Sequence, residues 1–386
     1  MDFKPTEQQN EGIRKIIQWF RQGDNQVFYL AGYAGTGKTT ITQYAIDALG
    51  LSIASDLDVM FGAYTGKAAL VMRKNGLITS TTIHRMIYQP YEDEHGHIKF
   101  RLNKDSMLRS TKLVVLDECS MIDDNMANDL KSFGVKILVL GDPGQIRPIK
   151  GEGAFTRQTP DHFLTEVHRQ AADSPIIKLA TWAREKKTIP LGDYGDGVRV
   201  VDINSTTLDF NHLLNAEQII TGKNDTRRML NKEIKDAHGF TDAYPLKQGI
   251  KLICLRNRHN LGLLNGMTFW TAGEKPYISK NGKFILQSVV DEDQTVLEDL
   301  EIGTGAFIDY SRKRTDKEVM DELRSRTIQL FDYGFAVTCH KSQGSQWEEV
   351  FIYDDGFGMW DSSIRAEWAY TAITRAAKKL TICRAY

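Results

Sequence analysis

The segment at residues 32–40, GYAGTGKTT, limits the possible fold and function of this chain more than any other segment does. It follows an apolar run at 27–31 that is typical of a buried strand, and it precedes residues 41–49, where apolar side chains recur at helical spacing. A glycine-rich turn between a strand and a helix is the setting of a P-loop. Gly35 and Gly37 lack Cβ atoms, so backbone N–H groups can converge on phosphates beside the positive end of the helix. The segment therefore predicts that the chain binds a nucleotide.

The side chains of this turn have separate expected tasks. Lys38 can reach the β- and γ-phosphate oxygens, and the Thr39 hydroxyl can take a place on Mg²⁺. We therefore predict ATP and Mg²⁺ as the cofactors, with the nucleotide held by Gly35, Thr36, Gly37, Lys38, Thr39 and Thr40.

Composition excludes several classes of protein. The 386 residues are 41% hydrophobic and 26% charged, as in an ordinary soluble protein of several domains. No apolar run approaches the roughly 18 residues of a membrane span, and the N-terminus carries no signal-peptide pattern. The four cysteines have neither metal-like nor disulfide-like spacing, so we expect a cytoplasmic protein without a membrane partner. The net charge of −1 means that a nucleic-acid partner would need a local basic groove.

Short apolar runs bounded by turns predict two α/β units on parallel sheets. They lie at 27–31, 59–63, 113–116 and 136–140, and again at 218–221, 335–338, 350–353 and 380–383. Two stretches do not follow this pattern of short apolar runs. Residues 88–101 are polar and could form a hairpin turning at 94–96, whereas 246–310 contains short β-like segments. Asn-Gly pairs at 265–266 and 281–282 are turn signals, so this second stretch predicts a small inserted β-barrel.

Two further strand ends carry candidate catalytic groups. Asp117 and Glu118 end the apolar strand at 113–116, where Asp117 would hold Mg²⁺ and Glu118 would deprotonate the attacking water. A pair of solvated acids at a strand end is the alternative. Gln145 follows the next strand in a turn fixed by Gly and Pro, and its amide could sense the γ-phosphate or the attacking water. It could also simply face solvent.

Arginines and loop donors complete the candidate set. Arg169 and Arg375 could neutralise transition-state charge from the second unit, although surface arginines are usually only solvated. Hydroxyl, imidazole and ammonium groups follow several strands, where ligands normally bind. The candidates for nucleic-acid phosphates are Thr65, Lys67, His84, Thr338, His340 and Lys341, and the histidines could equally be buried and satisfied.

In this order, the segments resemble the motifs of superfamily 1 helicases, closest to the RecD-like and phage Dda-type branch. The resemblance rests on GYAGTGKT, AYTGKAA, TTIHR, LDECSM, GDPGQIRP, LTEVHRQ, AVTCHKSQGSQ and YTAITRA, and on the TEQQ sequence at 6–9. It also includes residues 247–270, which resemble the opening of an SH3-like barrel. Tyr33, Tyr64 and Arg147 depart from the usual residues, and Tyr64 puts the exact DNA contact of its motif in doubt.

The resemblance implies residue roles. Gln9 would read adenine, and Arg169 and Arg375 would be arginine fingers. Thr65, His84, Thr338 and His340 would contact single-stranded DNA, and the segment 86–110 would be the pin that splits the duplex. The hairpin expected there would project Tyr91, His95 or Phe100 towards the junction.

The resemblance also implies an architecture. It predicts a first RecA-like motor domain at 1–85 and 111–165 with a pin at 86–110. A second motor domain follows at 166–245 and 327–386, with an SH3-like barrel at 246–326. The two domains would close over ATP and step 5′ to 3′ on single-stranded DNA.

The leading expectation is an ATP-dependent DNA helicase, active as a monomer on duplexes with a 5′ single-stranded tail. The chain lacks the N-terminal extension of bacterial RecD-type proteins, which favours a stand-alone phage-type enzyme. Three alternatives are an ATP-gated nucleic-acid clamp without unwinding, an RNA helicase of the same superfamily and a P-loop kinase. The kinase is disfavoured because it would lack a second sheet followed by the last two motifs.

Overall fold

The computed structural model describes residues 4–92, 98–147, 153–167, 173–204, 210–258, 261–274, 276–307 and 327–385. The chain divides into two compact units. The first comprises residues 1–189, 343–345 and 360–374, and the second comprises 190–342, 346–359 and 375–386. Helix α12 (Ser362–Ile373) therefore belongs to the first unit, although the strands before and after it belong to the second.

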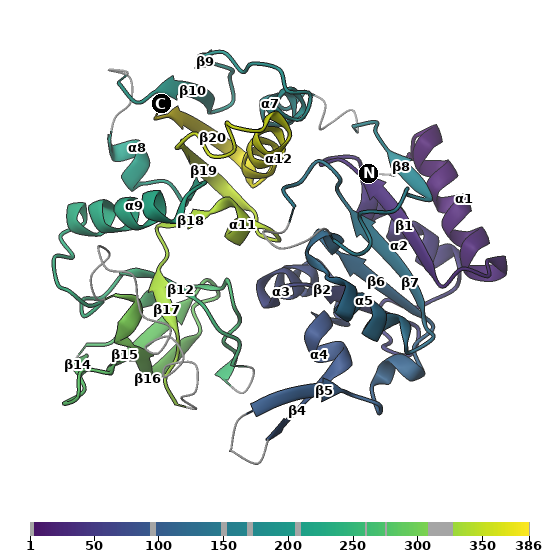
Figure 1. Ribbon diagram of the computed structural model, residues 1–386, viewed down its shortest axis with the longest axis horizontal. Helices are drawn as coiled ribbons and strands as arrows, with labels where there is room; N and C mark the ends of the chain where they lie inside the picture. Colours follow the sequence, from purple (N-terminus) through teal and green to yellow (C-terminus); the bar gives the residue numbers. More distant parts are fainter. Residues whose placement is uncertain are drawn as a thin grey trace. The chain divides into compact units, whose positions relative to one another are not determined.

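A six-stranded parallel sheet forms the centre of the first unit (Figure 1). Its order is β3 (Ser80–Thr82), β2 (Val59–Ala63), β6 (Leu113–Asp117), β7 (Lys136–Gly141), β1 (Val27–Gly32) and β8 (His162–Leu164). Strands β1 and β6 both pair with β7, so the ends of these three strands are neighbours. The segments after them are those in which the sequence predicts nucleotide chemistry.

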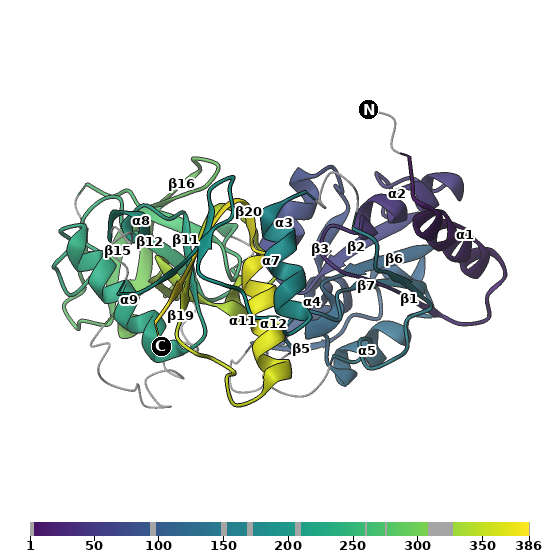
Figure 2. The ribbon, with the colours of Figure 1, turned by 90° about the horizontal axis from the view of Figure 1, so that it is seen from above.

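Alternate residues of each strand pack on opposite faces of this sheet, which gives the first unit two apolar cores. One core joins the sheet to α1 (Glu7–Gln22), α2 (Lys38–Ala48) and α3 (Gly66–Lys74). The other joins it to α4 (Ile83–Ile87) and α5 (Asp124–Lys131), with short 3₁₀ turns at Met107–Arg109 and Cys119–Met121. Helix α7 (Pro175–Arg184) lies beside α12 (Figure 1 and Figure 2).

The second unit contains a six-stranded sheet in which only the edge strand β9 runs antiparallel to its neighbour. Its order is β18 (Ala336–Thr338), β11 (Gln218–Thr221), β19 (Trp347–Asp354), β20 (Ala376–Arg384), β10 (Val198–Asp202) and β9 (Gly192–Asp193). Helices α8 (Phe210–Leu214) and α9 (Asn224–Ala237) pack against it, and α11 (Cys339–Ser342) follows β18.

An antiparallel sheet is also part of the second unit. Its order is β14 (Tyr277–Ile278), β15 (Phe284–Asp291), β13 (Thr268–Thr271), β12 (Lys251–Cys254) and β17 (Phe331–Tyr333), and β16 (Val296–Gly303) pairs with β15 before the 3₁₀ turn Thr304–Ala306. Gly266 and Gly282 have φ of +89° and +67°, so both predicted Asn-Gly turns are confirmed.

The predicted α/β fold with parallel sheets is confirmed, and all eight apolar runs lie in or beside the expected strands. The predicted hairpin is confirmed as β4 (Tyr88–Glu92) paired antiparallel with β5 (Ile98–Leu102). The residues of its turn, 93–97, lie outside the described ranges. The four-part domain division, including the pin and the SH3-like barrel, stays a prediction.

Candidate nucleotide site and nucleic-acid contacts

The P-loop connects β1 to α2 with glycines in conformations that other residues rarely adopt. Gly37 precedes the first turn of α2 with φ of +82°, and a Cβ there would lie 2.8 Å from Nε2 of Gln9. Lys38 Nζ donates to the backbone oxygens of Gly32 at 2.7 Å and Tyr33 at 3.3 Å. The ammonium group is therefore held against the P-loop, where it is predicted to bind the phosphates of the nucleotide. Thr39 and Thr40 form the next residues of α2, so their placement follows from the same helix start.

The side chain of Gln9 is hydrogen-bonded to the P-loop. Its side chain is 1% exposed, and Nε2 donates to the backbone oxygen of Thr36 at 2.9 Å. Its Oε1 accepts from the backbone N–H of Thr6, and the Thr6 hydroxyl accepts in return from the backbone N–H of Gln9. This capping box starts α1. The predicted reading of adenine by Gln9 stays a prediction, and the described contacts give the same amide a structural task.

The acidic pair and the amide of the next strand lie together. Asp117 ends β6 and accepts from the backbone N–H of Glu118 at 2.8 Å. Glu118 has φ of +53°, a left-handed conformation that is strained for any residue with a Cβ. Gln145 Nε2 donates to Glu118 Oε1 at 3.4 Å, and the Gln145 side chain is 8% exposed. The second amide atom, Gln145 Oε1, is buried without a hydrogen-bond partner in the described part of the chain.

An orphaned buried amide oxygen beside a carboxylate is suited to orienting a water molecule. A buried polar atom without a partner costs free energy, of about 1–3 kcal/mol, and calls for an explanation. Glu118 can accept a proton from such a water, and Gln145 can hold the water in place. The structure thus brings the two side chains together, and their roles as base and as water-orienting amide stay predictions.

Thr39 and Asp117 also fit a magnesium ion. The hydroxyl and the carboxylate are hard oxygen donors, and Mg²⁺ usually takes only one or two protein ligands beside phosphates and water. Within the described ranges, no cluster of three or more His, Cys, Asp or Glu side chains could hold a metal by itself.

Sequence reasoning missed two residues beside this site. Asp142 follows β7 and is buried, and burial raises the pKa of its carboxyl, while Lys38 and the Tyr370 hydroxyl act to lower it. Tyr370 of α12 donates to Asp142 Oδ2 at 2.6 Å and accepts from the backbone N–H of Ala34 at 2.7 Å. Asp142 and Tyr370 belong to the quoted GDPGQIRP and YTAITRA segments, but neither segment indicates that the two residues meet.

Five of the predicted DNA contacts lie in the first unit, beside its sheet or on the hairpin. Thr65 caps α3 by accepting from the backbone N–H of Ala68, and Lys67 is buried in the same helix. The ring of His84, in α4, lies 4.4 Å from that of Phe100 at the centroids, and Phe100 is 54% exposed. Tyr91, on β4, is stacked under the guanidinium of Arg101.

The remaining three predicted DNA contacts lie in the second unit. Thr338 ends β18, and His340 and Lys341 follow in α11. Burial lowers the pKa of Lys341, and its Nζ donates to Asn265 Oδ1 at 3.5 Å. Arg375 directly follows the C-cap of α12, and its backbone oxygen accepts from the N–H of Trp347. Arg169 lies outside the described residues.

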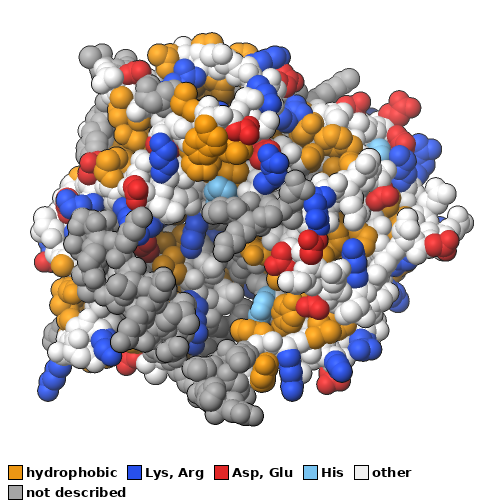
Figure 3. Space-filling model, viewed as in Figure 1, with side chains coloured by type: hydrophobic (Ala, Val, Ile, Leu, Met, Phe, Trp, Pro, Cys, Tyr) orange, Lys and Arg blue, Asp and Glu red, His pale blue; other side chains and the backbone are white. Residues whose placement is uncertain are grey.

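On the face that Figure 3 draws, the described basic side chains do not stand apart from the acidic ones. Figure 3 shows Lys and Arg side chains interspersed with Asp and Glu over the face that it draws. This pattern agrees with the net charge of −1. In the described part of the chain, no helix has the length and apolar character needed to cross a membrane.

A parallel sheet with a P-loop after one strand and an acidic pair after another defines the class of P-loop nucleotide-binding proteins. Residues 6–204 match the AAA domain family, and residues 333–383 match the UvrD-like helicase C-terminal domain. Because the first match covers more than half of the sequence, the chain belongs to the AAA domain family.

Individual relatives agree with this assignment. The ATP-dependent RecD2 DNA helicase of Deinococcus radiodurans is 25% identical over 366 residues, which are 91% of this chain and 46% of that protein. The ATP-dependent DNA helicase dda of Enterobacteria phage T4 is 29% identical over 195 residues, 47% of this chain and 43% of that protein. The chain thus spans less than half the length of either relative in these matches.

A solved structure extends the likeness to the fold. Bacteroides Pif1 bound to single-stranded DNA superposes with a TM-score of 0.59 at 16% identity, over 99% of this chain and 92% of that chain. At this identity the likeness shows the fold alone. Together the matches confirm the resemblance to superfamily 1 helicases of the RecD-like and Dda-type branch.

Proposed function

We propose that this chain is an ATP-dependent DNA helicase that translocates 5′ to 3′ on single-stranded DNA and separates duplexes with a 5′ tail. The observation that supports it most is the pairing of Glu118 with Gln145 next to the P-loop, at the ends of neighbouring strands. That arrangement suits hydrolysis of a nucleotide rather than binding alone. The names of the two curated relatives favour DNA as the polymer on which hydrolysis acts.

In this proposal, each residue of the site has one task. Lys38 neutralises charge on the β- and γ-phosphates. Thr39 and Asp117 would hold Mg²⁺, which would supply further positive charge to the nucleotide. Glu118 takes the proton of the attacking water, and Gln145 orients that water. Arg375 and Arg169 supply the remaining positive charge when DNA is bound.

The polymer would be held mainly by its phosphates, through Thr65, Lys67, His84, Thr338, His340 and Lys341. The β4–β5 hairpin would serve as the pin, with Phe100 or Tyr91 stacked on a base at the fork. The antiparallel sheet of β12–β17 would be the SH3-like barrel. We further propose that the protein acts as a monomer in the cytoplasm, or in a host cytoplasm if a phage encodes it, in replication or recombination.

A strand-displacement assay with ATP separates the alternatives. Duplexes with a 5′ DNA tail, a 3′ DNA tail and a 5′ RNA tail are compared at equal tail length. We expect displacement of the first only. ATP hydrolysis stimulated by single strands without any displacement would instead indicate a nucleic-acid clamp, and preference for the RNA tail would indicate an RNA helicase.

A further inference from the structure

Helix α12 presents three side chains, one turn apart, to the segment that carries Gln145. Glu367, Tyr370 and Thr371 occupy positions i, i+3 and i+4, which share one face of a helix. All three contact residues 142–147, which follow β7. The sequence separations are more than 200 residues, so no local pattern requires these contacts.

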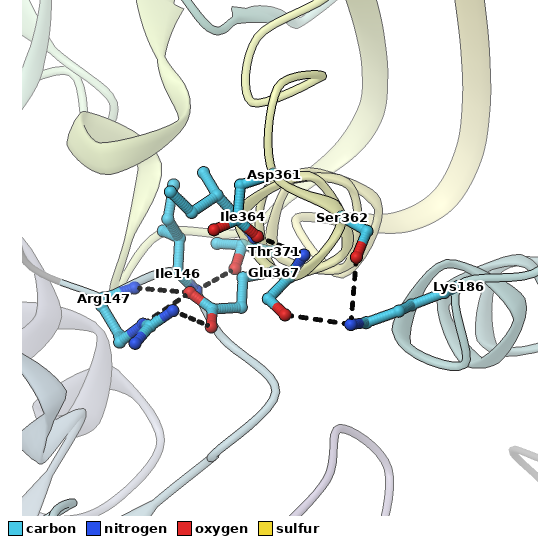
Figure 4. A network of polar contacts seen from close by, with 9 residues as sticks. Ile146, Arg147, Lys186, Asp361, Ser362, Ile364, Glu367 and Thr371 are labelled. Atoms are coloured by element: carbon cyan, nitrogen blue, oxygen red, sulfur yellow. Dashed lines mark hydrogen bonds and ion pairs between the residues drawn. The ribbon is translucent and has the colours of Figure 1, made fainter.

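Two of the contacts hold the segment just after Gln145 (Figure 4). The backbone N–H of Ile146 donates to the Thr371 hydroxyl at 2.7 Å. Arg147 forms an ion pair with Glu367, in which Nη2 lies 3.0 Å from Oε1 and Nε donates to Oε2 at 3.1 Å. Arg147 departs from the small or apolar residue that is commoner in this position, and the ion pair gives that departure a structural reason.

The third contact holds the segment just before Gln145. The Tyr370 hydroxyl donates to Asp142 Oδ2, and the other oxygen of Asp142 accepts from the backbone N–H of Gly144 at 2.9 Å. The Tyr370 ring packs on Gly144 so closely that a Cβ there would lie 3.0 Å from the ring. The turn is thus fixed on both sides of Gln145, by side chains of a single helix.

The same hydroxyl also reaches the P-loop. It accepts from the backbone N–H of Ala34 at 2.7 Å, so one buried oxygen connects the P-loop to the Gln145 turn. Replacing this oxygen would leave a buried N–H and a buried carboxylate oxygen each without this partner. Moreover, Thr374 N–H bonds to the Tyr370 backbone oxygen, and Arg375 is the next residue. A predicted arginine finger therefore follows directly on the helix that positions the turn.

We propose that Tyr370 is a positioning residue for ATP hydrolysis, whose hydroxyl holds the P-loop and the Gln145 turn in fixed register. This inference rests on the proposed function. Tyr370 touches neither nucleotide nor water in this account, because it acts through Asp142 and Ala34. It therefore governs the rate of the chemical step more than nucleotide affinity, to which Lys38 and the loop amides contribute directly.

A simple packing role is the competing explanation, and Tyr29 provides a matched control. Tyr29 is buried on β1 in the same unit, and its hydroxyl has no hydrogen-bond partner in the described residues. Tyr370→Phe and Tyr29→Phe each remove one buried hydroxyl and keep the ring. Only the first breaks the contacts to Asp142 and Ala34.

The experiment measures steady-state ATP hydrolysis with saturating single-stranded DNA for wild type and both variants. We expect Tyr370→Phe to lower kcat about tenfold or more and to change KM for ATP by less than about twofold. We expect Tyr29→Phe to leave both values near wild type. Thermal melting of each variant, run in parallel, shows that the assay temperature lies below unfolding.

The pH dependence of kcat provides a second test, because a loss of packing alone would not shift it. The titratable groups that face Asp142 are Lys38 of α2, Tyr29 of β1, Glu118 after β6 and Tyr370 of α12. The Tyr370 hydrogen bond lowers the pKa of Asp142 against the dominant effect of burial. Removing the Tyr370 hydroxyl therefore raises the pKa of Asp142. The acid limb of the pH profile, where kcat falls as the pH is lowered, then moves to higher pH. Asp142→Asn, which cannot titrate, serves as a second variant: it should remove the part of the acid limb that Asp142 contributes, so that adding Tyr370→Phe to it shifts the limb no further, while the part due to protonation of Glu118 remains.

The outcomes are separable. No DNA-stimulated hydrolysis by wild type would refute the proposed function itself. Active wild type with Tyr370→Phe equal to Tyr29→Phe in kcat and in the acid limb would refute only the role of Tyr370. A lower melting temperature for Tyr370→Phe with unchanged kcat would likewise assign Tyr370 to packing.

Discussion

At the scale of single residues, the backbone of Glu118 is where this protein departs most from relaxed geometry near its site. Its left-handed conformation follows the last residue of β6, and its N–H is taken by the Asp117 side chain. A non-glycine residue held there costs of order 1–3 kcal/mol and persists only where its surroundings determine it. In this conformation the Glu118 carboxylate accepts a hydrogen bond from Gln145, as its proposed role beside the attacking water requires.

The first prediction concerns this carboxylate. Glu118→Gln should bind ATP normally but lower kcat by about 10²-fold or more, because it keeps the shape and loses the base. Lys38→Ala should weaken nucleotide binding itself. Equilibrium binding of a fluorescent ATP analogue and single-turnover hydrolysis distinguish the two effects. Near-normal turnover by Glu118→Gln would remove Glu118 from its assigned role.

The second prediction concerns the cysteines, all four of which are buried thiols. Burial raises the pKa of Cys339 to about 12 and those of Cys254 and Cys383 to about 11, and it raises the pKa of Cys119 as well. The reactive thiolate is therefore scarce in the folded protein at pH 8. A chromogenic disulfide reagent should label almost nothing in native protein and four thiols after denaturation.

The same shifts set a direction for stability. The thiols ionise more readily in the unfolded chain, so their contribution is fully present below pH 9 and is lost as pH rises towards 11–12. The midpoint of denaturant unfolding should fall across that window. Rapid labelling of a native thiol at pH 8 would contradict the burial on which both expectations depend.

At the scale of elements, the hairpin of β4 and β5 is attached to the first unit through Tyr88 at the start of β4, whereas Phe100 on β5 is exposed. Tyr88 donates its hydroxyl to Asp129 Oδ2 at 2.5 Å, and its ring lies against His84. Phe100 contacts the other side of His84 while remaining largely exposed. A predicted DNA contact of the motor and a predicted pin aromatic are thus in van der Waals reach of each other.

The third prediction follows from that exposure. Phe100→Ala should keep DNA-stimulated ATP hydrolysis while unwinding slows about tenfold, since base–aromatic stacking is worth about 1–3 kcal/mol. Leu57→Ala, which truncates another half-exposed apolar side chain of the first unit, is the control. Both activities are measured on one 5′-tailed duplex. Equal unwinding by the two variants would place strand separation elsewhere.

Elements of this fold are predictable where their sequence signal is local. Buried parallel strands are continuous apolar runs, so β1, β2 and β6 could be located to within a residue. The P-loop and the acidic pair follow such strands, which is why the site could be predicted as well. The Tyr370–Asp142 contact joins residues 228 positions apart, and the bond from Gln9 to the P-loop oxygen of Thr36 joins residues 27 positions apart. Neither contact leaves a periodic or compositional trace.

At the scale of the whole molecule, the chain crosses between its two units on either side of α12. Trp360 and Thr374 bound the part of this segment that belongs to the first unit, and Arg375 begins the next segment of the second. Binding of DNA to both units would act on this connection, because Thr338 and His340 belong to one unit and Thr65 and His84 to the other. Hydrolysis that depends on DNA is the expected consequence.

The last prediction tests that dependence. Wild type should hydrolyse ATP slowly alone and many-fold faster with single-stranded DNA, and Arg375→Ala should lose most of the stimulation. Lys378→Ala, which removes an exposed lysine three residues further along β20, is the matched control and should keep it. DNA affinity of both variants should stay near wild type and fall steeply with added salt, because the expected contacts are to phosphates. If Arg375→Ala lost DNA binding in proportion to stimulation, the arginine would belong to the DNA interface, and the charge on the transferred phosphate would have to be met by another residue.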